Sequence, residues 1–104
     1  MPFDSLPSVK RLDRIDESIL EAARYLQEHG WIQGRARDRM GRTCLYGALE
    51  FIDLYSSTMA LGRIGKYLGV INPVHWNDVK GRTKDEVIDA LQGTVYHRIR
   101  KGRN

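Results

Sequence analysis

The segment from Gly30 to Leu49 constrains the fold of this chain more than any other part of the sequence. It holds four of the ten glycines, one of the two tryptophans and the single cysteine. Glycine reaches backbone conformations that side chains exclude, whereas tryptophan and cysteine favour packed positions. The segment therefore predicts a turn of defined shape and not a generic linker.

An amphipathic helix is predicted before this segment. Apolar residues recur there at spacings of three and four, which places them on one helical face: Ile15, Ile19, Ala22, Ala23 and Leu26. Asp13 or Asp16 can cap its amino terminus, because a carboxylate accepts hydrogen bonds from the unpaired amides of the first turn. Gly30 is the expected end of the helix.

A short β-hairpin is expected within the glycine-rich segment. Residues 32–35 and 42–44 can pair as two strands around a turn at residues 38–41. Gly41 supplies the positive φ angle that such a turn needs. The hairpin would join the first predicted helix to the second.

Two helices are predicted in the middle of the chain. One begins at Thr43 or Cys44, and the other follows the polar break at residues 56–57. Gly62 and Gly65 each weaken this latter helix by about 1 kcal/mol relative to alanine. Glycines in such places often mark the close approach of another backbone.

A long irregular connection precedes the last helix. Proline, asparagine and glycine favour turns over residues 70–82. Thr83 and Glu86 then form a capping box, the clearest helix start in the chain. The sequence as a whole predicts a mainly α protein of about four helices with the hairpin between the first two. We expect an N-terminal arm over residues 1–12 and a single helical domain over residues 13–104.

Composition argues against several classes of protein. No apolar run reaches the roughly 20 residues that cross a bilayer, and the amino terminus lacks the charged and apolar regions of a signal peptide. We therefore expect a cytoplasmic protein with no membrane partner. A single cysteine cannot form an internal disulfide, and no short His/Cys pair has the spacing of zinc ligands. Neither a metal nor another cofactor is expected.

The order of motifs along the chain resembles that of a known family. The motifs are His29-Gly30-Trp31, Gln33-Gly34, Asp38, Gly41-Arg42 and Cys44-Leu45-Tyr46-Gly47-Ala48-Leu49, followed by Trp76-Asn77-Asp78 and Gly81-Arg82-Thr83. Over about residues 15–100, the chain is similar to small uncharacterised proteins of actinobacteria and their bacteriophages. The resemblance implies that setting, and it implies no activity and no functional residue.

Cys44 allows two interpretations. At the start of a helix, the helix dipole lowers the pKa of a thiol, and His75 with Asn77 or Asp78 can supply a base and its orienting group. Cys44, His75 and Asp78 are thus candidate catalytic residues of a cysteine hydrolase. The other interpretation is a small buried apolar residue, which the neighbouring leucine, tyrosine and alanine favour. We prefer it, because the triad rests on residue types alone.

A recognition cleft is predicted if the hairpin and the later loop meet. An indole beside amide and carboxylate groups can stack on a ligand or partner and hydrogen-bond to it. The candidate binding residues are Trp31, Gln33, Asp38, Trp76, Asn77 and Asp78. In the structural alternative, both tryptophans pack on the core, and the amide and carboxylate form a turn.

Nucleic acid is an alternative partner. The net charge of +4 and the pI near 9.5 suit an acidic partner, although many proteins with such a balance bind no polyanion. Phosphate contacts need clustered cations. One cluster lies in the turn and one near the carboxyl end: Arg35, Arg37, Arg39 and Arg42, then Arg98, Arg100 and Lys101. The structural alternative is a solvated turn and cations that complement the negative end of the last helix.

Binding to a protein partner is the favoured function. The sequence holds no phosphate-binding loop, no dinucleotide fingerprint and no catalytic motif of known geometry. Compact, shape-specifying residues without catalytic motifs favour a binding protein, and the family resemblance adds an accessory role in a bacterial or phage setting. Nucleic-acid binding and a Cys44-dependent hydrolase are the alternatives.

Overall fold

Helices joined by one long loop and several short links make up the computed structural model, which describes residues 12–102. The predicted N-terminal arm lies, except for residue 12, outside the described residues. The elements are α2 (Arg14–His29), α3 (Leu45–Ile52), the 3₁₀ helix η2 (Leu54–Ser56), α4 (Ser57–Leu68), α5 (Pro73–Asn77) and α6 (Lys84–Gly102). The predicted mainly α class is confirmed.

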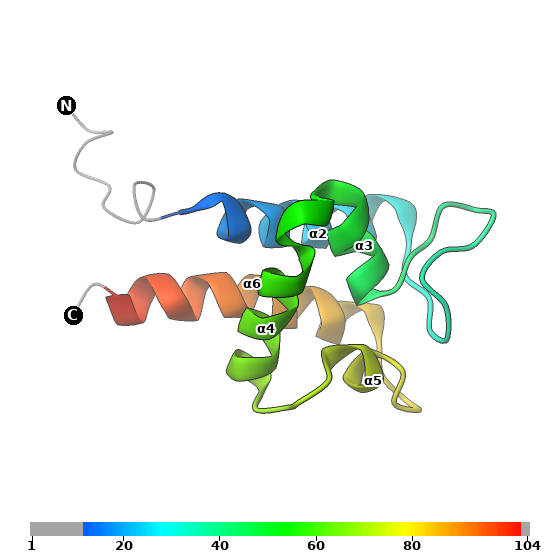
Figure 1. Cartoon of the computed structure of the whole chain (residues 1–104). Coiled ribbons are helices and arrows are strands. Elements are labelled where there is room, and N and C mark those ends of the chain that lie inside the picture. Colours follow the sequence, from blue (N-terminus) through cyan, green and yellow to red (C-terminus); the bar gives the residue numbers. More distant parts are fainter. Residues whose placement is uncertain (1–11, 103–104) are drawn as a thin grey trace.

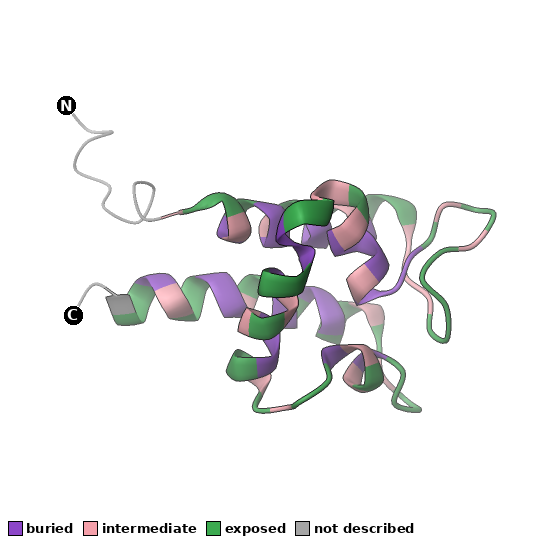
Figure 2. Ribbon diagram, in the orientation of Figure 1, coloured by how far each residue is buried: buried purple, intermediate pink, exposed green. Residues whose placement is uncertain are grey.

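The two longest helices, α2 and α6, lie side by side and run in opposite directions (Figure 1). α3 and α4 pack against them on one side, and α5 packs against α3 and α4. Figure 2 shows that the faces turned toward one another are buried. The largest fully buried apolar side chains come from four helices: Ile19, Leu26, Leu45, Leu49, Ile64, Val87, Leu91 and Val95.

The first helix begins and ends at the residues that the sequence indicates. The side chain of Asp13 accepts a hydrogen bond from the Asp16 amide at 2.8 Å, and the Asp13 amide donates to the Asp16 carboxylate at 3.2 Å. Both candidate caps therefore take part in one reciprocal capping box. At the other end, Gly30 has a φ of +103°, and its amide donates to the Leu26 carbonyl at 2.9 Å.

The predicted β-hairpin is wrong. Within the described chain, residues 31–43 form no paired strands, and the only bridges are isolated ones from Trp31 and Arg37 to Thr43. The Trp31 bridge is parallel, because the Ile32 amide donates to the Thr43 carbonyl and the Thr43 amide to the Gly30 carbonyl. The chain leaving α2 and the chain entering α3 thus run in the same direction at this point. Parallel neighbours cannot form the antiparallel ladder of a hairpin.

A short helix, α5, lies inside the connection that was expected to be irregular. The Asn72 side chain accepts hydrogen bonds from the amides of Val74 and His75, at 3.0 and 3.2 Å. Pro73 occupies the first helical position, where its missing N–H removes no hydrogen bond. The Asn-Pro pair, within the connection predicted to be irregular, is therefore a helix start.

The last helix starts at the predicted capping box. The Thr83 amide donates to the Glu86 carboxylate at 2.9 Å, and the Glu86 amide donates to the Thr83 hydroxyl at 3.2 Å. The apolar residues that recur at helical spacing along this helix are buried: Val87, Ile88, Leu91, Val95 and Ile99. Local capping and periodicity thus located α6 correctly.

A buried carboxylate joins three helices at the end of the molecule opposite the long loop. Asp16 of α2 is fully buried and accepts hydrogen bonds from Arg63 of α4 at 2.8 Å and from Nε of Arg98 of α6 at 3.0 Å. Arg98 also contacts Asp16 through its Nη2. Arg63 additionally pairs with Asp13 at 2.7 Å, and this hydrogen bond holds the pKa of Asp13 well below its usual value. Arg98, a candidate nucleic-acid contact, therefore helps to hold the helices together.

Candidate functional site

The segment after α2 and the end of α5 meet, as the cleft prediction required. Nε1 of Trp31 donates to Oδ1 of Asn77 at 2.6 Å. Gln33 donates to the carbonyl of Asn77 at 3.0 Å, and the Gly34 amide donates to the Asp78 carboxylate at 3.0 Å. We call Trp31, Gln33, Asn77 and Asp78 the Asn77 junction. Four of the six candidate binding residues therefore come together.

The polar groups of the Asn77 junction bond to one another. Asn77 is fully buried, and its Oδ1 accepts a second hydrogen bond from the Leu45 amide at 3.1 Å. Its Nδ2 donates to Asp78 at 2.8 Å and to the Ile32 carbonyl at 3.4 Å. A buried amide with its donors and its acceptor occupied stabilises the fold and offers no group to a ligand. The junction therefore locks the loop to α3 and α5.

The two remaining candidate binding residues are engaged within the protein. Trp76 is half-buried, and the guanidinium of Arg82 lies 3.9 Å from the centroid of its ring. Asp38 accepts hydrogen bonds from the amides of Met40 and Arg42, each at 2.9 Å, and pairs with Nε of Arg42 at 2.6 Å. Trp76 therefore stacks on its own chain, and Asp38 closes the turn.

Cys44 caps α3 through its sulfur. The Gly47 amide donates to Sγ at 3.3 Å, whereas the hydroxyl of Thr43 is buried and has no hydrogen-bond partner in the described part of the protein. Cys44 is 4% exposed, and burial raises the pKa of its thiol. Burial thus outweighs the helix dipole, which was expected to lower this pKa. The reactive thiolate is disfavoured, and the candidate base, His75, lies exposed on α5.

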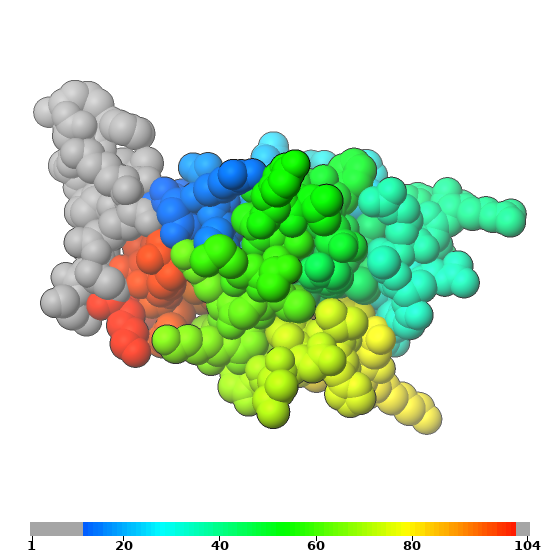
Figure 3. Space-filling model, in the orientation of Figure 1, coloured from blue at the N-terminus to red at the C-terminus, as the bar shows by residue number. Residues whose placement is uncertain are grey.

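The long loop packs tightly on α3 at a glycine. We call residues 33–42 the arginine loop; it projects beyond the helices at one end of the molecule (Figures 1 and 3). A Cβ atom at Gly47 would lie 2.1 Å from the carbonyl oxygen of Ala36. That oxygen accepts a hydrogen bond from the Cys44 amide at 3.2 Å, and Tyr25 donates to the carbonyl of Gly41 at 2.9 Å. The loop is therefore exposed to solvent, while hydrogen bonds from Cys44 and Tyr25 hold its backbone in place.

Replacing Gly47 with alanine is expected to lower the free energy of unfolding by about 1–3 kcal/mol, because the added methyl must displace backbone. The matched control is Gly62→Ala in α4, where nothing lies within 4 Å of the new Cβ. This control is expected to stabilise the protein by about 0.5–1 kcal/mol, since alanine favours helix. Urea unfolding measures both effects. Equal effects would contradict the close approach at Gly47.

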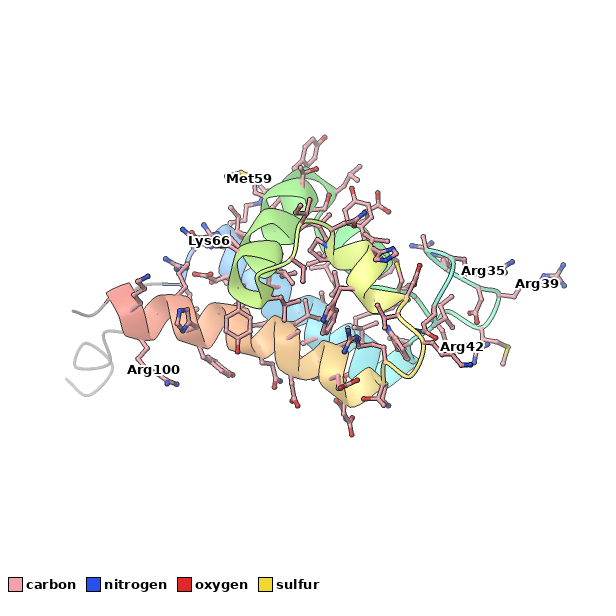
Figure 4. The ribbon with its side chains drawn as sticks, turned by 90° about the horizontal axis from the view of Figure 1, so that it is seen from below. Arg35, Arg39, Arg42, Met59, Lys66 and Arg100 are labelled. Atoms are coloured by element: carbon pink, nitrogen blue, oxygen red, sulfur yellow. The ribbon has the colours of Figure 1, made fainter. Side chains whose placement is uncertain are left out.

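All four arginines of the loop are open to solvent. Figure 4 shows Arg35 and Arg39 extending outward, whereas Arg42 is paired with Asp38. The guanidinium of Arg37 lies 5.2 Å from the centroid of the Phe51 ring, within reach of a cation–π interaction. The loop therefore presents positive charge beside an aromatic side chain.

The two predicted basic clusters do not form one surface. Figure 4 shows Arg100 at one end of the molecule and Arg35 and Arg39 at the other. Lys101 follows Arg100 at the end of α6, and Arg98 is bonded to Asp16. A helix of this length spans about 28 Å, which keeps the clusters apart.

An exposed apolar surface lies where α3 leads into α4, a stretch that fills the centre of the face in Figure 3. We call it the apolar corner; its residues are Phe51, Leu54, Tyr55 and Met59, which are 54%, 62%, 88% and 63% exposed. Tyr55 and Met59 also line an open cavity of about 260 Å³ with Ile15 and Arg14. Sequence reasoning missed this surface.

The signal for the apolar corner was present in the sequence. Phe51 falls off the helical stripe that Leu45 and Leu49 define, so it was available to face solvent. Ser56 and Ser57, interpreted as a polar break, are buried instead. The chain turns at the end of α3, and this turn buries the serines while exposing the apolar residues around them.

The described residues hold no group of three or more His, Cys, Asp or Glu side chains that could bind a metal ion. Of the helices in the same described range, none combines the length and the apolar composition needed to cross a bilayer.

Comparison with known proteins places the chain in a family. No curated protein and no solved structure matches the sequence. The model of a family of unknown function, DUF6197, matches residues 11–95. The match covers the Asn77 junction, the arginine loop and the apolar corner, whereas Arg98, Arg100 and Lys101 lie beyond it. The protein therefore belongs to the DUF6197 family.

Proposed function

We propose that this protein is a small binding protein that docks a protein partner on the apolar corner. The exposure of this corner carries the proposal, because all four of its large apolar side chains are more than half open to solvent. Burying apolar surface is favourable by about 25 cal/mol per Å². Tyrosine, phenylalanine and methionine are also enriched in protein interfaces. Clustered exposed side chains of this kind mark interaction sites.

The proposed setting is the cytoplasm of an actinobacterium, with the gene carried by the bacterium or by its phage. The resemblance of the sequence to actinobacterial and bacteriophage proteins supports this setting and an accessory role. The Asn77 junction supports the binding role indirectly, because its hydrogen bonds hold the loop beside α3.

Nucleic-acid binding through the arginine loop is the second candidate. The outward direction of Arg35 and Arg39 favours it, because phosphate contacts need accessible cations. The position of Arg100 at the opposite end weakens it, since the two basic clusters cannot contact one short stretch of duplex together. The apolar side chains of the corner favour a protein surface over a polyanion.

The proposal predicts that a double variant of the corner, Tyr55→Ser with Met59→Ser, loses its partner. The full-length chain is immobilised, and proteins from an actinobacterial lysate are captured and identified with and without nuclease treatment of the lysate. The captured protein is then purified and titrated calorimetrically. We expect the corner variant to bind it at least about tenfold more weakly, because truncated aromatic anchors at an interface centre cost this much or more.

The control is Tyr96→Ser with Ile71→Ser, which removes two side chains that are also exposed, by 51% and 103%, but lie outside the corner. Binding should survive in this variant. Retention of the same protein by the corner variant would contradict the proposal. Capture that disappears after nuclease treatment would favour nucleic acid, and a concentration-dependent dimer abolished by the corner variant would assign the corner to self-association.

A further inference from the structure

We propose that the partner presents an acidic amphipathic segment to this protein. Its apolar side chains would pack on the apolar corner, and its carboxylates would pair with Arg35, Arg37 and Arg39. This inference rests on the proposed function, because it names the chemistry of the partner that the corner takes.

The arginine loop meets the apolar corner at one residue, Phe51. Arg37 of the loop lies with its guanidinium 5.2 Å from the centroid of the Phe51 ring. The same ring lies 4.9 Å from that of Tyr25, whose hydroxyl bonds to the loop at Gly41. Phe51 therefore belongs to the corner and touches the loop. A single extended or helical segment of a partner can cover both.

The charge of this surface is positive on the loop side. Within the arginine loop, four arginines stand against one aspartate, a net charge of +3. That aspartate, Asp38, is paired with Arg42, and the other three guanidiniums pair with no carboxylate among residues 12–102. At the other edge of the corner, Asp53 is paired with Arg14 at 2.6 Å. Uncompensated cations beside an apolar patch select an acidic partner.

The loop holds its arginines in place before a partner arrives. The carboxylate of Asp38 accepts two backbone amides and closes the turn. The Ala36 carbonyl accepts a hydrogen bond from the amide of Cys44, the cap of α3, and the Gly34 amide donates to Asp78. A braced backbone loses less conformational entropy on binding, so charge on such a loop yields more affinity than charge on a free tail.

A second copy of this chain fits the surface poorly. A two-fold contact brings the same patch of both copies together. The two arginine loops would then border one interface, and like charges brought together oppose association. An acidic segment instead neutralises the loop while it covers the corner.

Selection of displayed random peptides against the full-length chain tests this inference. We expect the enriched peptides to combine an excess of aspartate and glutamate with apolar residues at helical spacing. A synthetic copy of an enriched peptide should bind about tenfold more weakly to the Arg35→Glu, Arg39→Glu double variant, and its affinity should fall as salt rises. The charge-matched control is Arg100→Glu with Lys101→Glu, which changes the net charge equally at the other end of the molecule and should leave binding unchanged.

The outcomes separate this inference from the proposed function. If the enriched peptides had no acidic excess but no longer bound the Tyr55→Ser, Met59→Ser variant, the inference would be overturned and the proposed function would stand. Enriched peptides that bind the corner variant as tightly as the parent protein would overturn both the inference and the proposed function. Failure to enrich any peptide overturns the inference as well. A duplex oligonucleotide could instead bind as tightly as the peptides, lose its affinity in the Arg35→Glu, Arg39→Glu variant and keep it in the corner variant. This result would assign the loop to nucleic acid.

Discussion

Replacing Asp16 with alanine is expected to lower the free energy of unfolding by about 3–5 kcal/mol. The Asp16 carboxylate is fully buried and bonds to guanidiniums from two other helices. Removing it leaves Arg63 and Arg98 without this partner at the helix junction, and breaking a buried ion pair in this way costs several kcal/mol. A domain of this size has about 5–15 kcal/mol of stability in total, so the loss threatens folding at ordinary temperature.

Urea unfolding followed by circular dichroism measures the effect of Asp16→Ala. The control is Asp89→Ala, an exposed aspartate on α6, which should change the stability by less than about 0.5 kcal/mol. Asp16→Asn keeps the shape and an acceptor oxygen while it removes the charge, so it should fall between these two variants. If Asp16→Ala were as mild as the control, the ion cluster would not hold the helices together.

Replacing Asn77 with alanine is expected to cost about 3 kcal/mol, the second of the two largest effects. The change leaves the indole N–H of Trp31 and the amide of Leu45 without their acceptor. Each unsatisfied buried group costs about 1–3 kcal/mol. Asn72→Ala, which removes the cap of α5 and no buried bond of this junction, should cost only about 1 kcal/mol.

Hydrogen exchange of the Trp31 indole N–H reports directly on the Asn77 junction. In the parent protein this proton is bonded to Asn77 at 2.6 Å and should exchange slowly. In Asn77→Ala it should exchange quickly, while Asn72→Ala should leave it protected. An indole that stays protected in Asn77→Ala would show that the junction does not hold the loop.

The ends of α2 and the start of α6 were predictable because their determinants are local. Asp13 and Asp16 form one box, and Thr83 and Glu86 form another, each between residues three positions apart in the sequence. Such short-range bonds depend little on the rest of the fold. The apolar stripes of the first and last helices were predictable for the same reason, since helical periodicity alone places their residues on one face.

The hairpin was not predictable from local rules, because the partners of the loop are distant. Gln33 and Gly34, interpreted as part of one strand, bond instead to Asn77 and Asp78, each 44 positions along the chain. Turn-forming residues such as Gly41 indicate that the backbone reverses, but they do not say what the reversed chain pairs with. Long-range hydrogen bonds decided that choice.

For the candidate site too, the sequence predicted one part and only the tertiary structure decided the other. The prediction that the glycine-rich segment and the Trp76-Asn77-Asp78 stretch come together is met by direct hydrogen bonds. Whether such residues bind a ligand or one another depends on tertiary distances, and here they hydrogen-bond to one another. Helical periodicity indicated only that Phe51 lies off the buried stripe. The exposure of Leu54, Tyr55 and Met59 escaped prediction because it depends on which neighbours cover these side chains.

The sequence by itself determined the helical class, the capping boxes, the apolar stripes and the presence of a specially shaped segment after the first helix. The tertiary structure alone decided that Cys44 is a buried cap, that Arg98 holds Asp16, and that Phe51 and Tyr55 are left open beside the arginine loop. The physical reason is the distance along the sequence over which each kind of interaction acts. Propensity and capping act over a few residues, whereas burial, ion pairing and surface charge arise only when distant segments meet.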